Sequence, residues 1–122
     1  ATDLGRVPQA LLDEGMRADF AVIESNHDRA MLWGGTYPKF LKERIAGGRG
    51  HLSNEQAAEA IVRWSGGRLR KVLLGHLSEA NNDPALAVKC VEAALRKRAG
   101  LRAYGVKVEA APRDGPLRIA LA

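Results

Sequence analysis

Two short apolar runs, each followed at once by polar residues, constrain the fold of this chain more than any other feature. Residues 20–23 are apolar without alternation and lead into the polar stretch 24–28, and residues 72–74 lead into the polar stretch 75–78. Such uninterrupted runs are typical of strands that are covered on both faces, as in a parallel sheet. Polar residues directly after such strands lie at the carboxyl edge of the sheet, where α/β folds gather their functional sites.

Helical patterns separate the two apolar runs. Ser53 and Gln56 have the spacing of a capping box, which predicts that a helix begins there. The apolar residues that follow have the spacing of one buried helix face: Ala57, Ala60, Ile61 and Trp64. A second, longer helix is predicted to begin at Asp83-Pro84 and to run to about Arg98. The alternation of strands and helices predicts a layered α/β fold with at least one parallel crossover.

The remaining segments complete this outline. Helices are expected over residues 7–16 and from Pro38 to the glycines at 47–50. Residues 104–110 and 117–121 are predicted strands, and Asp114-Gly115 between them favours a hairpin, which would make the sheet mixed. No linker or repeat divides residues 1–122, so they are expected to form a single unit.

Composition narrows the partners and the compartment. The formal net charge of +5 and the pI of about 9.8 point to an anionic partner such as nucleic acid or a phosphate ester, although dispersed basic residues also suit a solvated surface. No apolar run is long enough to span a membrane and no signal peptide is recognisable, so a cytoplasmic protein is expected. Cys90, the single cysteine, falls on an apolar helix face and is predicted to be a core residue. The chain does not begin with Met, which fits a fragment or a processed product.

Four polar residues are expected to meet if the strands are parallel neighbours: Asp3, Glu24, His27 and His76. Carboxylates and imidazoles together suit a divalent metal such as zinc. Spacing alone leaves a second interpretation open, because a histidine after a strand is more often a hydrogen-bonding loop residue than a ligand. The P-loop pattern, the Gly-x-Ser-x-Gly pattern and the His-Glu-x-x-His pattern are all absent, which counts against the chemistries they support.

Four ordered motifs resemble a known family. Residues 2–5, 24–28, 50–55 and 74–78 with Asn81-Asn82 resemble an exonuclease-like bacterial branch of the metallo-β-lactamase superfamily that is related to ribonuclease Z. The resemblance covers nearly the whole chain and implies a four-layer αββα sandwich made of two halves. This chain would be the C-terminal half, a sheet with covering helices. The family's first metal motif, His-x-His-x-Asp-His, has no counterpart in these 122 residues, so the N-terminal half is expected to be missing.

The resemblance also implies roles for individual residues. Asp3 is similar to the aspartate that bridges two divalent ions, Zn or Mn, and His76 is similar to the last metal-binding histidine. His51 is similar to a histidine that contacts the scissile phosphate and can donate a proton, and His27 would be a second catalytic residue. Further residues are expected to contact the substrate or to support the ligands: Glu24, Asn26, Asp28, Ser78 and Asn81.

The expected function is therefore metal-dependent hydrolysis of phosphodiester bonds, with nucleic acid as the substrate. Two alternatives remain open: a small-molecule hydrolase of the same fold that acts on a cyclic phosphodiester or another ester, and a non-catalytic interaction module. Without the histidine-rich half, the isolated chain is expected to be inactive. Its uncovered sheet face is expected to pair with the missing half or with a second copy of the chain.

Overall fold

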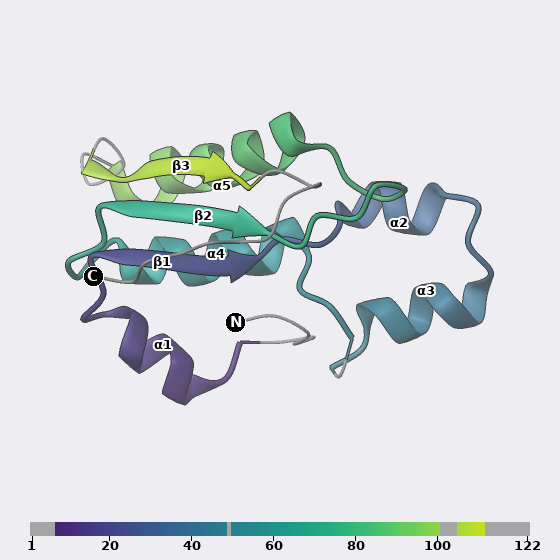
Figure 1. Ribbon diagram of the computed structural model, residues 1–122, viewed down its shortest axis with the longest axis horizontal. Coiled ribbons are helices and arrows are strands. Elements are labelled where there is room, and N and C mark those ends of the chain that lie inside the picture. Colours follow the sequence, from purple (N-terminus) through teal and green to yellow (C-terminus); the bar gives the residue numbers. More distant parts are fainter. Residues whose placement is uncertain (1–6, 49, 101–104, 112–122) are drawn as a thin grey trace.

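The fold is a layered α/β arrangement in which helices and strands alternate (Figure 1). The computed structural model describes residues 7–48, 50–100 and 105–111. The elements in this part of the chain are α1 (Gln9–Gly15), β1 (Phe20–Glu24), α2 (Arg29–Gly34), α3 (Lys39–Ala46), α4 (Asn54–Trp64), β2 (Lys71–Gly75), α5 (Pro84–Ala99) and β3 (Lys107–Ala110).

The three described strands form a parallel sheet in the order β1-β2-β3. The predicted parallel crossover is therefore confirmed. In this register Glu24 at the end of β1 lies beside Gly75 at the end of β2, so the polar residues that follow both strands leave the sheet at one edge. The predicted strand 104–110 is confirmed from Lys107 onward. The antiparallel strand 117–121 and its hairpin, which would have made the sheet mixed, lie outside the described residues.

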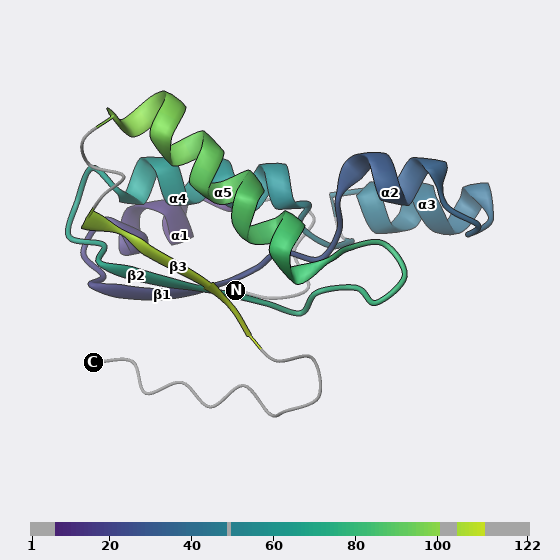
Figure 2. The same cartoon turned by 90° about the horizontal axis from the view of Figure 1, so that it is seen from above.

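The core lies between the sheet and the helices α4 and α5, which cover the same face of the sheet (Figure 2). Alternate residues of β1 and β2 point into this layer and are fully buried, among them Ile23 and Leu74. They pack with the predicted apolar faces of the two long helices: Ala57, Ala60, Ile61 and Trp64 of α4, and Ala87, Val91 and Leu95 of α5. On the other face of the sheet, Phe20, Val22 and Leu73 are partly buried.

Local capping positions these helices at the strand ends. In α4 the Gln56 amide donates to Ser53 Oγ at 3.1 Å and the Ser53 amide donates to Gln56 Oε1 at 2.9 Å, which confirms the capping box. In α5 the Asp83 carboxylate accepts a hydrogen bond from the Leu86 amide at 3.2 Å, and Pro84 occupies the first turn. Each cap is typically worth about 1 kcal/mol of folding stability. Cys90 is half-buried beside the core, and burial raises the pKa of its thiol.

One helix was not predicted from the sequence. Helix α2 follows Asp28, whose carboxylate caps it by accepting a hydrogen bond from the Met31 amide at 2.9 Å. Its six residues make fewer than two turns, too short for a periodic apolar pattern. Together α2 and α3 extend away from the sheet (Figure 2), and residues 29–46 are called the arm below. Among the described helices, none is both long and apolar enough to cross a membrane.

Candidate functional site

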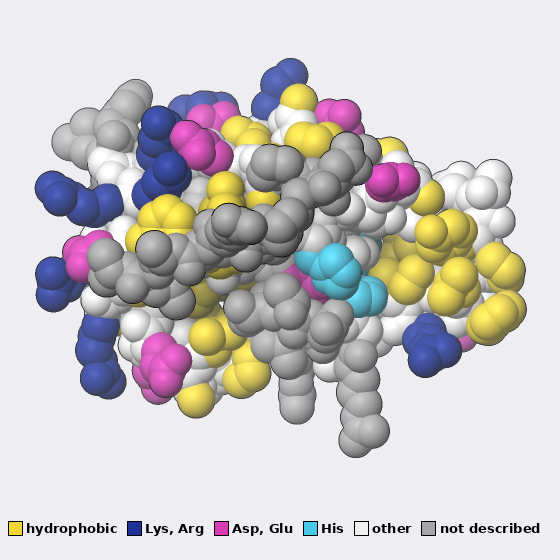
Figure 3. All heavy atoms as spheres, in the orientation of Figure 1, with side chains coloured by type: hydrophobic (Ala, Val, Ile, Leu, Met, Phe, Trp, Pro, Cys, Tyr) yellow, Lys and Arg dark blue, Asp and Glu magenta, His cyan; other side chains and the backbone are white. Residues whose placement is uncertain are grey.

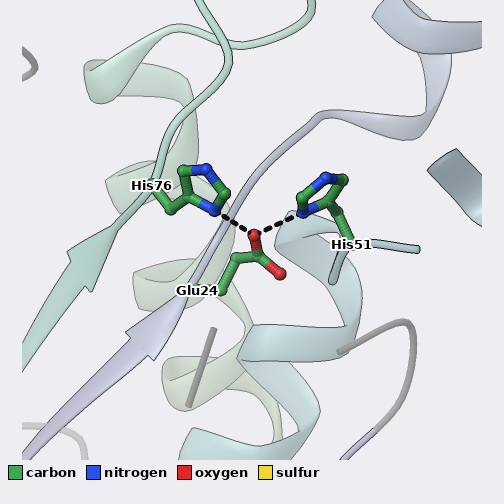
Figure 4. A group of neighbouring side chains, drawn as sticks. All are labelled: Glu24, His51 and His76. Atoms are coloured by element: carbon green, nitrogen blue, oxygen red, sulfur yellow. Dashed lines mark hydrogen bonds and ion pairs between the residues drawn. The ribbon is translucent and has the colours of Figure 1, made fainter. Parts of the chain in front are cut away.

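A single buried carboxylate joins two histidines at the carboxyl edge of the sheet (Figure 4). Glu24, the last residue of β1, is fully buried, and its Oε2 lies 2.7 Å from His51 Nδ1 and 2.5 Å from His76 Nδ1. Its other oxygen, Oε1, accepts a hydrogen bond from the Leu52 amide at 3.0 Å. Both oxygens of the Glu24 carboxylate are therefore used to hold the segment around His51, and one of them also holds His76.

The two histidines come from different loops. His51 precedes α4, and His76 directly follows β2 with a φ of 56°, the one positive φ at a non-glycine residue among those described. Their rings stand edge to face with centroids 5.1 Å apart. The His51 side chain is 30% exposed and that of His76 is 47% exposed, whereas that of Glu24 is 0% exposed. The site therefore places two accessible imidazoles over a carboxylate that water does not reach.

The distances around Glu24 indicate how a metal ion would be held. Two ligands of a tetrahedral zinc ion, each about 2.0–2.1 Å from the metal, lie about 3.3 Å from one another. The contacts of 2.5 and 2.7 Å are shorter and match charge-assisted hydrogen bonds from Nδ1–H to a carboxylate. A histidine held in this way presents its opposite nitrogen, Nε2, to a metal. The three side chains form a group that can hold a divalent ion, and the carboxylate fits the role of orienting the rings.

Asn26 ties the loops of both histidines together. Its side-chain Nδ2 donates to the His76 carbonyl oxygen at 3.1 Å, and its backbone amide donates to the Leu52 carbonyl oxygen at 2.8 Å. Its own carbonyl oxygen accepts from the Ser78 amide, also at 2.8 Å. Because Asn26 is only 8% exposed, these hydrogen bonds are shielded from water, and the residue fixes the loop after β2 against the start of α4.

A buried hydrogen-bond network joins Ser25, Asn54 and Asn82, and the sequence predicted only part of it. Asn82 Nδ2 donates to the Ser25 carbonyl oxygen at 2.8 Å, and Asn54 Nδ2 donates to Asn82 Oδ1 at 2.9 Å. The Ser25 hydroxyl donates to Asn54 Oδ1 at 2.5 Å. Asn54, at the first position of α4, was not among the expected site residues. Its polar side chain directly after the N-cap was a signal that could have identified it.

His27 belongs to the buried layer of the site rather than to its accessible rim. It is 2% exposed, and its Nδ1 lies 3.2 Å from Asn26 Oδ1. Burial is the main reason why the pKa of His27 lies below its ordinary value of 6.5. The charges of His51 and Arg29 lower this pKa further, against the opposing effect of Glu24 and Asp28. The imidazole of His27 is therefore neutral near pH 7.

The other expected site residues shape the loops. Asp28 caps α2 through its side chain, and its amide donates to the Asn81 carbonyl oxygen at 2.9 Å. The Asn81 amide in turn donates to the Ser78 hydroxyl at 3.1 Å. Asp3, the expected bridging ligand, lies outside the described residues. Of the four residues expected to meet at the sheet edge, Glu24 and His76 do so, and His51 joins them.

A hollow of about 350 Å³ lies beside the two histidines. It is lined by residues of the site and of the arm: Asn26, Tyr37, Leu41, Ile45, His51, His76, Leu77 and Ser78. The His51 amide donates to the Ile45 carbonyl oxygen at 2.9 Å, which joins the end of α3 to the site. A larger hollow of about 610 Å³ lies elsewhere, along α1 and α4, and no histidine lines it. The side chains that line the smaller hollow therefore favour it as the functional site.

Comparison with known proteins identifies relatives over most of the chain. The chain is 46% identical over 86 residues to a protein named exodeoxyribonuclease WalJ from Streptococcus pneumoniae, which is 70% of this chain and 32% of that protein. It is 37% identical over 97 residues to one named exodeoxyribonuclease YycJ from Bacillus anthracis, which is 80% of this chain and 37% of that protein. The chain thus spans about a third of the length of these relatives.

No family model matches the chain, and no solved structure gives a significant match. The identity to the named relatives is nevertheless high and extends over most of the 122 residues. The chain is therefore a homologue of the bacterial proteins named exodeoxyribonuclease WalJ and YycJ, as its resemblance to the exonuclease-like branch of the metallo-β-lactamase superfamily predicts.

Proposed function

We propose that the complete protein is a metal-dependent nuclease that hydrolyses phosphodiester bonds in DNA, and that this chain supplies one part of its active site. The observation that carries the proposal is the hydrogen bonding of one buried carboxylate oxygen of Glu24 to both His51 and His76. The names of the relatives, which describe exodeoxyribonucleases, support DNA as the substrate.

The donor set of the site fits a divalent metal. His76 would be a ligand through Nε2 because its Nδ1 is held by Glu24, and Asp3 would be the second ligand from this chain. Two ions such as Zn²⁺ or Mn²⁺ would activate water and would stabilise negative charge on the phosphoryl oxygens. The remaining ligands would come from a histidine-rich N-terminal half, as the family resemblance implies.

His51 is assigned to proton transfer. Glu24 holds its Nδ1, which directs Nε2 toward the hollow, where a scissile phosphate would lie. A proton carried on Nε2 in that position would pass to the leaving oxygen. His27 is assigned a supporting role instead, because it is buried, neutral near pH 7 and in contact with Asn26.

A small-molecule phosphodiesterase is the second candidate. A hollow of about 350 Å³ is large enough for a single nucleotide, so a cyclic phosphodiester would also fit beside the histidines. The net charge of +5 favours the longer, more highly charged DNA substrate.

The experiment that separates these functions uses the complete protein, expressed with the histidine-rich N-terminal half that the family resemblance implies. End-labelled single-stranded and double-stranded DNA, a cyclic mononucleotide and bis-p-nitrophenyl phosphate are each incubated with Mn²⁺, with Zn²⁺ and with EDTA. Stepwise release of nucleotides from DNA that stops in EDTA is the expected result. Turnover of the cyclic mononucleotide without cleavage of DNA would favour the second candidate, and no turnover of any substrate with either metal would contradict both.

A further inference from the structure

The arm carries two exposed aromatic side chains. Trp33 is 48% exposed and Phe40 is 71% exposed, whereas Trp64, the second tryptophan, is 2% exposed. Figure 3 shows hydrophobic side chains gathered over α3, on the same face of the molecule as the histidines of the site. Trp33 and Phe40 lie on the two consecutive helices of the arm, and an exposed apolar patch on a protein surface indicates a binding surface.

The two aromatic residues lie at the connected ends of α2 and α3. Trp33 is in the last turn of α2, and Phe40 is in the first turn of α3. The Lys42 ammonium donates to the carbonyl oxygens of Trp33 and Gly35, both at 2.8 Å, so it holds the intervening loop against α3. These hydrogen bonds restrain the loop that joins the two helices, and a restrained surface loses less conformational entropy when a ligand binds.

The arm is continuous with the candidate active site. Tyr37, Leu41 and Ile45 line the hollow that also contains His51 and His76. Phe40 lies five residues before Ile45 on α3, which is about 7.5 Å along the helix axis at 1.5 Å per residue. Helix α3 therefore carries both Phe40 and residues that line the hollow, so a strand held at the histidines would have the arm as a neighbouring surface.

The charge of the arm suits a polyanion. Residues 29–46 contain four basic residues and one acidic residue: Arg29, Lys39, Lys42 and Arg44 against Glu43. The ion pair of Lys39 with Glu43 is long, at 3.8 Å, and exposed. Such a pair contributes little stability, so a phosphate can replace this carboxylate at low cost. Arg29 lies 4.0 Å from Glu55 Oε1, an oxygen that is buried. Aromatic rings interleaved with cations are the means by which proteins hold single strands.

We propose that the arm binds single-stranded DNA, with Trp33 and Phe40 stacking on unpaired bases while its basic residues contact the phosphates. This inference rests on the proposed function. It adds that the DNA is bound as an unpaired strand, by residues outside the group of Glu24, His51 and His76.

The binding is tested without catalysis, on the 122-residue chain in EDTA. Titration with an eight-nucleotide oligothymidylate should quench tryptophan fluorescence in the wild type. The same titration should leave the fluorescence of Trp33→Phe unchanged, because the only tryptophan left in that variant is Trp64, which is buried away from the oligonucleotide. Anisotropy of the labelled oligonucleotide should give dissociation constants about 5- to 150-fold weaker for Trp33→Ala and Phe40→Ala. Leu86→Ala, which removes an exposed hydrophobic side chain on α5, is the matched control and should bind like wild type.

Three results would overturn the inference. One is that Trp33→Ala and Phe40→Ala bind the oligonucleotide as Leu86→Ala does. A second is that a blunt duplex binds as tightly as the single strand and is insensitive to Phe40→Ala. The third is that sedimentation shows wild-type dimers that Trp33→Ala and Phe40→Ala dissociate, which would make the surface a protein interface. Because the titration contains no metal, it measures DNA binding without hydrolysis. A negative binding result therefore does not contradict the proposed hydrolysis, and a negative hydrolysis result does not contradict the proposed binding.

Discussion

Glu24 Oε2 lies 2.5 Å from His76 Nδ1, although 52 residues separate them in the sequence. Parallel pairing of β1 with β2 is responsible, because it places the ends of both strands side by side. The same oxygen lies 2.7 Å from His51 Nδ1. The orientation of both imidazoles therefore depends on one buried carboxylate.

Replacement of Glu24 by glutamine should weaken the metal site without unfolding the chain. Glutamine has a similar shape and can still accept from the Leu52 amide, but it lacks the negative charge that both Nδ1 atoms contact. Loss of a group that orients metal ligands typically costs 10- to 100-fold in metal affinity or activity, and a decrease of about that size is expected in the complete protein. Isothermal titration calorimetry with the metal ion measures this change in affinity. Glu79→Gln, an exposed change in the loop after β2, is the control, and equal affinities for the two variants would contradict the assignment.

Replacement of Asn26 by alanine should lower the free energy of unfolding of the chain more than a substitution at an exposed residue does. The substitution removes the donor to the His76 carbonyl oxygen and leaves buried polar groups unpaired, which costs about 1–3 kcal/mol of the free energy of unfolding. Urea denaturation measures this loss. Asn26→Asp keeps the size but not the Nδ2 donor, so it should lose the same contact to His76. A stability for Asn26→Asp equal to that of wild type would show that this contact does not matter.

The stability of the chain should fall below pH 6.5 because of His27. Its folded pKa lies below 6.5, so the unfolded chain binds the proton more readily than the folded chain does. Above pH 6.5, His27 is neutral in both the folded and the unfolded chain, so it does not reduce the free energy of unfolding. As the pH falls from 6.5 toward the folded pKa, the unfolded chain takes up the proton first, and the free energy of unfolding decreases. The charges that affect His27 are those of Glu24, His51, Arg29 and Asp28.

Urea unfolding of wild type and His27→Gln at pH 5 and pH 8 measures the His27 contribution. The loss of stability between the two values should be smaller in the variant, because glutamine does not titrate. An equal loss of stability in both proteins would show that titratable groups other than His27 cause the pH dependence.

The long helices and the sheet could be predicted from the sequence because their signals are local. The capping box at Ser53 and the Asp83-Pro84 start are both confirmed, and both depend on neighbouring residues alone. The proximity of Glu24 and His76 followed from the rule that parallel strands end at one edge. The hydrogen bond between His51 and Glu24 could not be predicted from spacing, because it depends on a loop whose position is set by the Ile45 carbonyl oxygen and the Glu24 carboxylate.

The sheet face opposite α4 and α5 should govern association. Phe20, Val22 and Leu73 lie on that face and are only partly buried. We expect the isolated chain to pair through this face with its N-terminal half or with a second copy, because an apolar sheet face is rarely left to water. Sedimentation at micromolar concentration measures it, with Val22→Lys expected to prevent pairing. A monomeric wild type that binds no hydrophobic dye would contradict the prediction.

Glu24 is proposed to hold two histidines with different tasks, His51 in proton transfer and His76 in metal binding. These roles are separated by measuring the metal content and the kcat of the complete protein for His51→Ala and for His76→Ala. His51→Ala should keep its metal and lose about 10²–10⁴-fold in kcat, the usual contribution of general acid catalysis. His76→Ala should lose metal and activity together. Loss of metal from His51→Ala, or full metal content in His76→Ala, would contradict this division of roles.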